Sequence, residues 1–138
     1  AVIATVHPQP LARPTNDAEY RHHFRLLREG LRRWMDAQAQ PQGMPPYRAF
    51  VAGVAAALDL VRERYQGDVL MVSSGGPIST AVGLLLSTPP QVTIDLNMRI
   101  RNSAVTELTF NPKRHTLVTY NSLPHLDGPE WQDWITHA

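Results

Sequence analysis

The stretch Asp68-Val-Leu-Met-Val-Ser-Ser-Gly-Gly-Pro-Ile-Ser-Thr-Ala-Val-Gly-Leu-Leu-Leu86 lies at the middle of this chain. Its apolar run Val69–Val72 is typical of a short strand that is covered on both faces. Gly75 and Gly76 allow the backbone to turn sharply and to approach a ligand closely. Pro77 suits the first turn of a helix, where its missing N–H costs nothing. The stretch therefore predicts a buried strand, a glycine turn and a helix.

A helix that begins where a strand ends is a natural place for an anion. The first N–H groups of the helix have no intrahelical acceptor, and the positive end of the helix dipole lies there. Phosphate is the common ligand of such a turn. The same spacing also fits a strand-to-helix connection that holds no ligand, so the spacing alone leaves both interpretations open.

Length and composition limit the remaining classes. A chain of 138 residues with 43% hydrophobic content can bury one core, so we predict a single domain over residues 1–138. A net charge of +1 gives no argument for nucleic acid as a partner. The absence of cysteine excludes disulfides, thiolate metal sites and cysteine nucleophiles. No apolar run approaches the roughly 20 residues that span a bilayer. No secretion signal is recognisable either, so we expect a cytoplasmic protein without a membrane partner.

Two amphipathic helices are expected before the central stretch. Apolar residues at three- and four-residue spacing predict one helix over about 17–38, with Asn16 as its N-cap, and another over about 46–65. Residues 39–46 form a linker by composition. A stripe of arginines on the first helix either helps to hold an anionic substrate or is a solvated face: Arg21, Arg25, Arg28 and Arg32.

The last third of the chain is expected to contain a hairpin. A short helix over 90–98 is preferred there to a strand, although the apolar residues of this segment alternate. Residues 104–110 and 116–120 are rich in β-branched residues and are separated by a turn-forming segment of hairpin length. Beyond the hairpin we expect a loop and one helical turn anchored by Trp131, Trp134 and Ile135.

Three stretches together resemble the C-terminal part of the histidine phosphatase superfamily, the group that includes the phosphoglycerate mutase-like enzymes. Val69–Ile78 is similar to the strand-then-glycine segment of the family. Arg101–Thr106 (Arg-Asn-Ser-Ala-Val-Thr) looks like its Asn-x-Ser-x-Thr stretch. Leu117–Leu126 is similar to a late strand that ends in Asn and is followed by His-Leu. The resemblance covers most of residues 17–128.

The resemblance implies a three-layer α/β/α sandwich and phosphoryl transfer through a phosphohistidine. In that chemistry a neutral imidazole attacks phosphorus, while cationic side chains and backbone N–H groups stabilise the negative charge. A carboxyl group then protonates the leaving oxygen. The substrate is therefore expected to be a phosphorylated small molecule, and neither a metal nor a cofactor is implied. Carried over to this sequence, the phosphate- and substrate-binding residues are Ser74, Gly75, Gly76, Asn102 and His125.

The sequence departs from the family pattern at two places. The nucleophile motif Arg-His-Gly is absent, and the nearest string, Arg21-His22-His23, lies within an expected helix and has no glycine. No catalytic residue is therefore assigned. Ser74 occupies the position where many members carry a second phosphate-binding histidine. A hydroxyl can donate one hydrogen bond to a phosphate oxygen, but it supplies less charge than an imidazolium.

The missing motif leaves alternatives for the whole protein. The strand that bears the nucleophile would lie beside Val69–Val72, so the sheet is expected to be incomplete on its N-terminal side. The chain then belongs to a longer enzyme, pairs with another copy or segment, or is a truncated, non-catalytic relative that binds a phosphorylated ligand or assembles with a partner. An α/β-hydrolase is disfavoured, because the first glycine of G-x-S-x-G does not precede Ser73 or Ser74. His125 is either a pocket residue or a packing residue.

Overall fold

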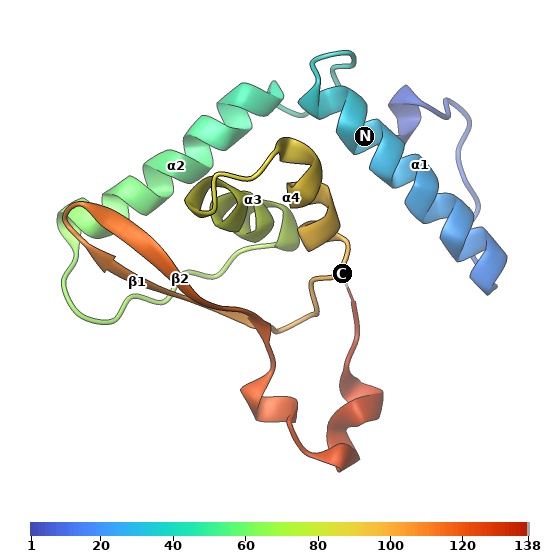
Figure 1. Ribbon diagram of the computed structural model, residues 1–138. Coiled ribbons are helices and arrows are strands. Elements are labelled where there is room, and N and C mark those ends of the chain that lie inside the picture. The colour runs from blue at the N-terminus through green and yellow to red at the C-terminus, as the bar shows by residue number, and fades with distance from the viewer. Residues whose placement is uncertain (138) are drawn as a thin grey trace. The chain divides into compact units, whose positions relative to one another are not determined.

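The computed structural model describes residues 1–137 (Figure 1). The chain divides into two compact units, residues 1–52 and residues 53–138, and helix α2 (Tyr47–Arg64) runs across the division. Helices and a two-stranded antiparallel sheet make up the regular structure of the described residues. The predicted α/β class is therefore confirmed. The single domain stays a prediction, and so does the three-layer sandwich.

The first unit is built around helix α1 (Asp17–Met35), which follows a 3₁₀ turn, η1 (Ile3–Thr5). Asn16 caps α1 as predicted, because its side-chain Oδ1 accepts a hydrogen bond from the Glu19 N–H at 3.0 Å. Asp17 and Glu19 place negative charge in the first turn, where the helix dipole favours it. The helix ends three residues before the expected boundary at 38.

An aromatic cluster forms the core of the first unit. The side chain of Trp34 is only 4% exposed, and its Nε1–H donates to the carbonyl of Pro45 at 2.9 Å. The rings of Tyr47 and Phe50 pack against it at centroid distances of 5.1 and 5.4 Å. The start of α2 is therefore held by α1 through apolar contact and one hydrogen bond.

In the second unit, helices α3 (Gly75–Leu85) and α4 (Pro90–Asn97) pack against each other. Gly83 permits the close approach, since a Cβ there would lie 2.5 Å from Thr93 Oγ1. Val82 and Ile94 are buried beside this contact. The preference for a helix over 90–98 is thus confirmed, and the alternating apolar residues of this segment do not form a strand.

The predicted hairpin is present as β1 (Val105–Asn111) and β2 (Arg114–Ser122). Its turn is tighter than expected, because the Asn111 side chain accepts from the N–H groups of Lys113 and Arg114 at 2.8 and 3.1 Å. The hairpin is joined to α2 at two points. His115 Nε2 lies 2.8 Å from the Leu58 carbonyl oxygen, and Arg62 donates to the Pro112 carbonyl at 2.8 Å.

The expectation of a buried strand at Val69–Val72 is wrong. The segment is not a strand in the described structure, and Leu70 and Val72 are 90% and 91% exposed. A strand needs a hydrogen-bonded neighbour, and this segment has none in residues 1–137, where β1 and β2 pair only with each other. The apolar run therefore connects α2 to α3 without a partner.

The C-terminal segment also differs from its prediction. It forms two 3₁₀ helices, η2 (Pro124–Leu126) and η3 (Pro129–Trp134). Trp131 and Trp134 pack edge to face at 5.7 Å, yet Trp134 is 68% exposed. The expectation that this tryptophan anchors the segment is therefore wrong, because the two rings cover each other and not a core.

Candidate functional site

The glycine turn forms the N-terminus of α3. Ser74 is the N-cap residue, with extended backbone (φ −93°, ψ 169°), and its hydroxyl makes no capping hydrogen bond to the helix. The N–H groups of the first helical residues, Gly75 and Gly76, have no intrahelical acceptor by the geometry of a helix. The turn therefore offers one hydroxyl and two N–H donors to an anion, together with the positive end of the helix dipole.

Gly75 is required by packing, whereas Gly76 is not. A Cβ at Gly75 would lie 2.6 Å from Ile100 Cγ2 and 2.7 Å from Asn97 Oδ1. No atom lies within 4 Å of a Cβ built at Gly76. The close contact at Gly75 brings the turn against the end of α4, immediately before Arg101.

A pair of hydroxyl groups, one of them fully buried, holds α3 in this position. Ser79 is fully buried, and its Oγ lies 3.2 Å from the Tyr120 hydroxyl, which donates to the Leu96 carbonyl at 2.9 Å. Burial raises the pKa of Tyr120, against a smaller opposing effect of the Ser79 hydrogen bond. The phenol therefore remains protonated at neutral pH and links α3, α4 and β2.

The junction between α4 and β1 is organised by Asn121. Its Oδ1 accepts from the Arg101 N–H and its Nδ2 donates to the Arg99 carbonyl, both at 2.8 Å. The guanidinium of Arg101 in turn donates to the Asn121 carbonyl. Asn121 and Ser103 both adopt left-handed backbone, with φ of 60° and 58°. Such conformations are uncommon for non-glycine residues and cluster at functional sites.

The predicted residues Asn102 and His125 lie at this same junction. The backbone N–H and the Nδ2 of Asn102 donate to the carbonyl and the hydroxyl of Thr136, both at 2.9 Å. His125 Nε2 lies 3.0 Å from Ser103 Oγ. Across the described chain, neither Asn102 nor His125 makes a hydrogen bond to the Ser74 turn. The predicted site therefore consists of two groups, which are linked through the contact of Gly75 with Ile100.

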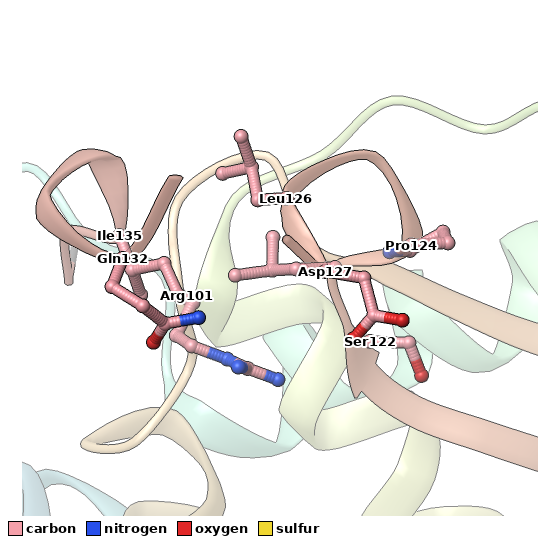
Figure 2. Close-up of a pocket in the computed structure, with 8 residues that line it drawn as sticks. Arg101, Ser122, Pro124, Leu126, Asp127, Gln132 and Ile135 are labelled. Carbon is pink, nitrogen blue, oxygen red and sulfur yellow. The ribbon is translucent and has the colours of Figure 1, made fainter. Parts of the chain in front are cut away.

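A cavity of about 340 Å³ opens at the junction (Figure 2). Its polar lining comes from Arg101, Ser122, Asp127 and Gln132, and its apolar lining from Leu123, Pro124, Leu126 and Ile135. The sequence interpretation missed this cavity. Arg101 begins the Arg101–Thr106 stretch that carries part of the family resemblance. No spacing signal joins it to Asp127 or Gln132, which reach the cavity through the two 3₁₀ turns.

Two features are absent from the described residues. Residues 1–137 contain no group of three or more histidine, aspartate or glutamate side chains placed to hold a metal ion. None of the helices that the structure describes is long and apolar enough to cross a membrane.

Comparison with known proteins gives one finding about family. The model of the histidine phosphatase superfamily (branch 1) matches residues 15–123. The match covers most of the chain and includes the Ser74 turn, Asn102 and Asn121, while His125 lies just beyond it. Comparisons with curated proteins and with solved structures gave no match.

Proposed function

Because this chain belongs to the histidine phosphatase superfamily, we propose that it holds the phosphoryl group of a small phosphomonoester at Ser74, Gly75 and Gly76. The activity that it serves is hydrolysis of that ester, or transfer of its phosphoryl group, through a phosphohistidine. The observation that carries the proposal is the glycine turn at the N-terminus of α3. The Ser74 side chain makes no capping hydrogen bond, so the first N–H groups of α3 stay available to a ligand. Gly75 packs against Ile100, which directly precedes Arg101 and Asn102.

The chemistry divides between this chain and residues that it does not contain. An imidazole nitrogen forms a bond to phosphorus as the ester oxygen leaves with a proton from a carboxyl group, and water then cleaves the N–P bond. No Arg-His-Gly motif supplies that imidazole in the 138 residues. The role proposed for the Ser74 turn is to stabilise the spreading negative charge on the phosphoryl oxygens.

The proposal includes a completed three-layer α/β/α sandwich in which Val69–Val72 becomes a strand. Its support is the exposure of this apolar segment: Leu70 and Val72 are 90% and 91% exposed, and the segment pairs with no strand within the described residues. The neighbouring strand comes from another copy of the chain or from an N-terminal segment that carries the nucleophile.

A second candidate is a non-catalytic module of the same fold, which binds a phosphorylated ligand or a partner chain without turnover. Ser74 favours it, because a serine at this position supplies a neutral hydroxyl where an imidazolium would supply a charge. The string Arg21-His22-His23 also favours it, because this string lies inside α1 and is not followed by glycine.

Titration of the 138-residue chain with inorganic phosphate, followed by backbone amide NMR, tests phosphate binding. We expect the largest shifts at Gly75 and Gly76, with weaker binding in Ser74→Ala. Ser74→His should bind phosphate more tightly because it restores a cationic donor. The control is Ser73→Ala, which changes a neighbouring exposed hydroxyl and should leave phosphate affinity unchanged.

Hydrolysis of p-nitrophenyl phosphate separates the two candidates. Turnover that is lost in Ser74→Ala supports the enzyme, whereas phosphate binding without turnover in any form of the protein supports the non-catalytic module. If neither phosphate-dependent shifts at the turn nor turnover is observed, both candidates are wrong.

A further inference from the structure

The cavity at the base of the hairpin is lined by two side chains of opposite charge that form no ion pair with each other. Arg101 and Asp127 both line it, yet the described structure contains no ion pair between them. Arg101 donates to the Asn121 carbonyl, and no further acceptor for its guanidinium is found in residues 1–137. The Asp127 carboxylate is exposed and has no hydrogen-bond partner in the same range. Figure 2 shows the guanidinium extending toward the side where Asp127 and Ser122 lie.

The remaining lining limits what can occupy the cavity. Ser122 and Gln132 are neutral, so the formal charges of Arg101 and Asp127 cancel and a net-neutral ligand is favoured. Leu126 and Ile135 give the cavity an aliphatic wall. A volume of about 340 Å³ lies at the small end of the range for ligand pockets, which begins near 300 Å³.

The walls of the cavity are tied together. Asn121 holds the backbone of Arg101 through its side chain, and Leu123, which lines the cavity, is buried at 8% exposure. Two hydrogen bonds from Asn102 to Thr136 join the start of the hairpin to the segment after η3. A cavity held in this way needs little ordering when a ligand binds, which favours affinity.

We propose that this cavity binds a small zwitterion, namely a free amino acid with an aliphatic side chain. The carboxylate pairs with Arg101, whose planar guanidinium suits a carboxylate. The ammonium group pairs with Asp127, and the side chain packs against Leu126 and Ile135. This proposal does not rest on the phosphate site. Most of the lining, from Pro124 onward, lies beyond the segment that the family model matches.

L-Valine is the probe that tests the proposal, because two simple molecules each lack one of its charges. 3-Methylbutanoate retains the carboxylate and the side chain but lacks the ammonium group, whereas isobutylamine retains the ammonium group but lacks the carboxylate. Amide NMR titration of the full chain should show L-valine shifting Arg101 and Asp127. Each analogue should bind about tenfold more weakly or worse.

Asp127→Asn tests the ammonium contact, and Asp133→Asn is its matched control on η3. Asp127→Asn should weaken L-valine binding about tenfold and should not weaken 3-methylbutanoate binding, since only the ammonium group uses Asp127. Asp133→Asn, which removes a carboxylate outside the cavity lining, should have no effect.

Three results would overturn the proposal: no L-valine shift at the cavity, 3-methylbutanoate binding as tightly as L-valine, or unchanged L-valine affinity in Asp127→Asn. The outcome is independent of the phosphate test, because L-valine contains no phosphate. Phosphate-dependent shifts at Gly75 without L-valine shifts at Arg101 would contradict the amino-acid site alone.

Discussion

At the scale of single residues, Asn121 determines the geometry at the base of the hairpin. It adopts a left-handed backbone, which asparagine tolerates better than most residues. From that position its amide group contacts the carbonyl of Arg99 and the N–H of Arg101. One side chain thus sets the course of the chain into β1 and the place of Arg101 in the cavity.

Replacement of Asn121 should measure this role. We expect Asn121→Ala to lower the free energy of unfolding by about 2 kcal/mol, since it removes two hydrogen bonds and leaves alanine at positive φ. Asn121→Asp keeps the acceptor for the Arg101 N–H and should cost about half as much. Urea denaturation gives both values, and equal losses would contradict the role assigned to the side chain.

Glu29 should make the stability of α1 dependent on pH in the acid range. Hydrogen bonds from Arg32 and then Arg33 lower the pKa of Glu29 from 4.5 to about 2. A carboxyl group with a lowered pKa in the folded state stabilises it above the unfolded pKa. This contribution is lost as the pH falls from about 4.5 to about 2.

The Glu29 prediction is checked by NMR titration of its side-chain carboxyl carbon and by unfolding at several pH values. Glu29→Gln should reduce the decrease in stability between pH 4.5 and pH 2. Glu130→Gln, which changes an exposed carboxylate on η3, is the control. A Glu29 midpoint near its ordinary value would show that the arginine contacts are weak in solution.

At the scale of elements, the start of α3 has two glycines with different roles. Gly75→Ala should lower the free energy of unfolding by about 1–3 kcal/mol, since the new methyl group would overlap Ile100 and Asn97. The methyl group added by Gly76→Ala would have no atom within 4 Å, so this substitution should stabilise α3 by up to about 1 kcal/mol. Thermal or urea unfolding compares the pair. A similar effect of both substitutions would mean that the Gly75 contact is not made.

The hairpin shows how far local sequence decides an element and where tertiary contact takes over. The hairpin is present as its β-branched segments and turn residues predicted, and Asn111 closes the turn; exposed and partly buried residues alternate along β1 and the first part of β2. Its link to α2 through His115 and the Leu58 carbonyl spans 57 positions of the chain. No periodicity or turn signal encodes such a pair, so the sequence predicted the hairpin but not its neighbour.

At the scale of the whole molecule, the exposed segment Val69–Val72 is the feature that calls for a partner. Leu70 and Val72 project almost entirely into solvent, and the backbone of the segment is not hydrogen-bonded to a neighbouring strand in the described structure. Exposed apolar strand-like segments pair readily with other chains. We therefore expect the 138-residue chain to self-associate through this segment.

Light scattering coupled to size exclusion tests self-association. The chain should elute with at least twice its mass of 15.4 kDa, and Leu70→Glu should restore the monomer. Leu60→Glu is the matched control, because Leu60 is also exposed (49%) but lies on α2. A monomeric wild-type protein at all concentrations would refute this expectation.

Local chemistry in the sequence was sufficient to predict the helices, the Asn16 cap, the glycine turn and the hairpin, because caps, periodicity and turn residues act over a few positions. It was also sufficient to place the chain in its family, since the motifs are short and occur in a fixed order. Tertiary structure alone decided that Val69–Val72 is exposed and that Arg101 and Asp127 line one cavity. A strand depends on a neighbour elsewhere in the chain, and a cavity depends on walls from several elements.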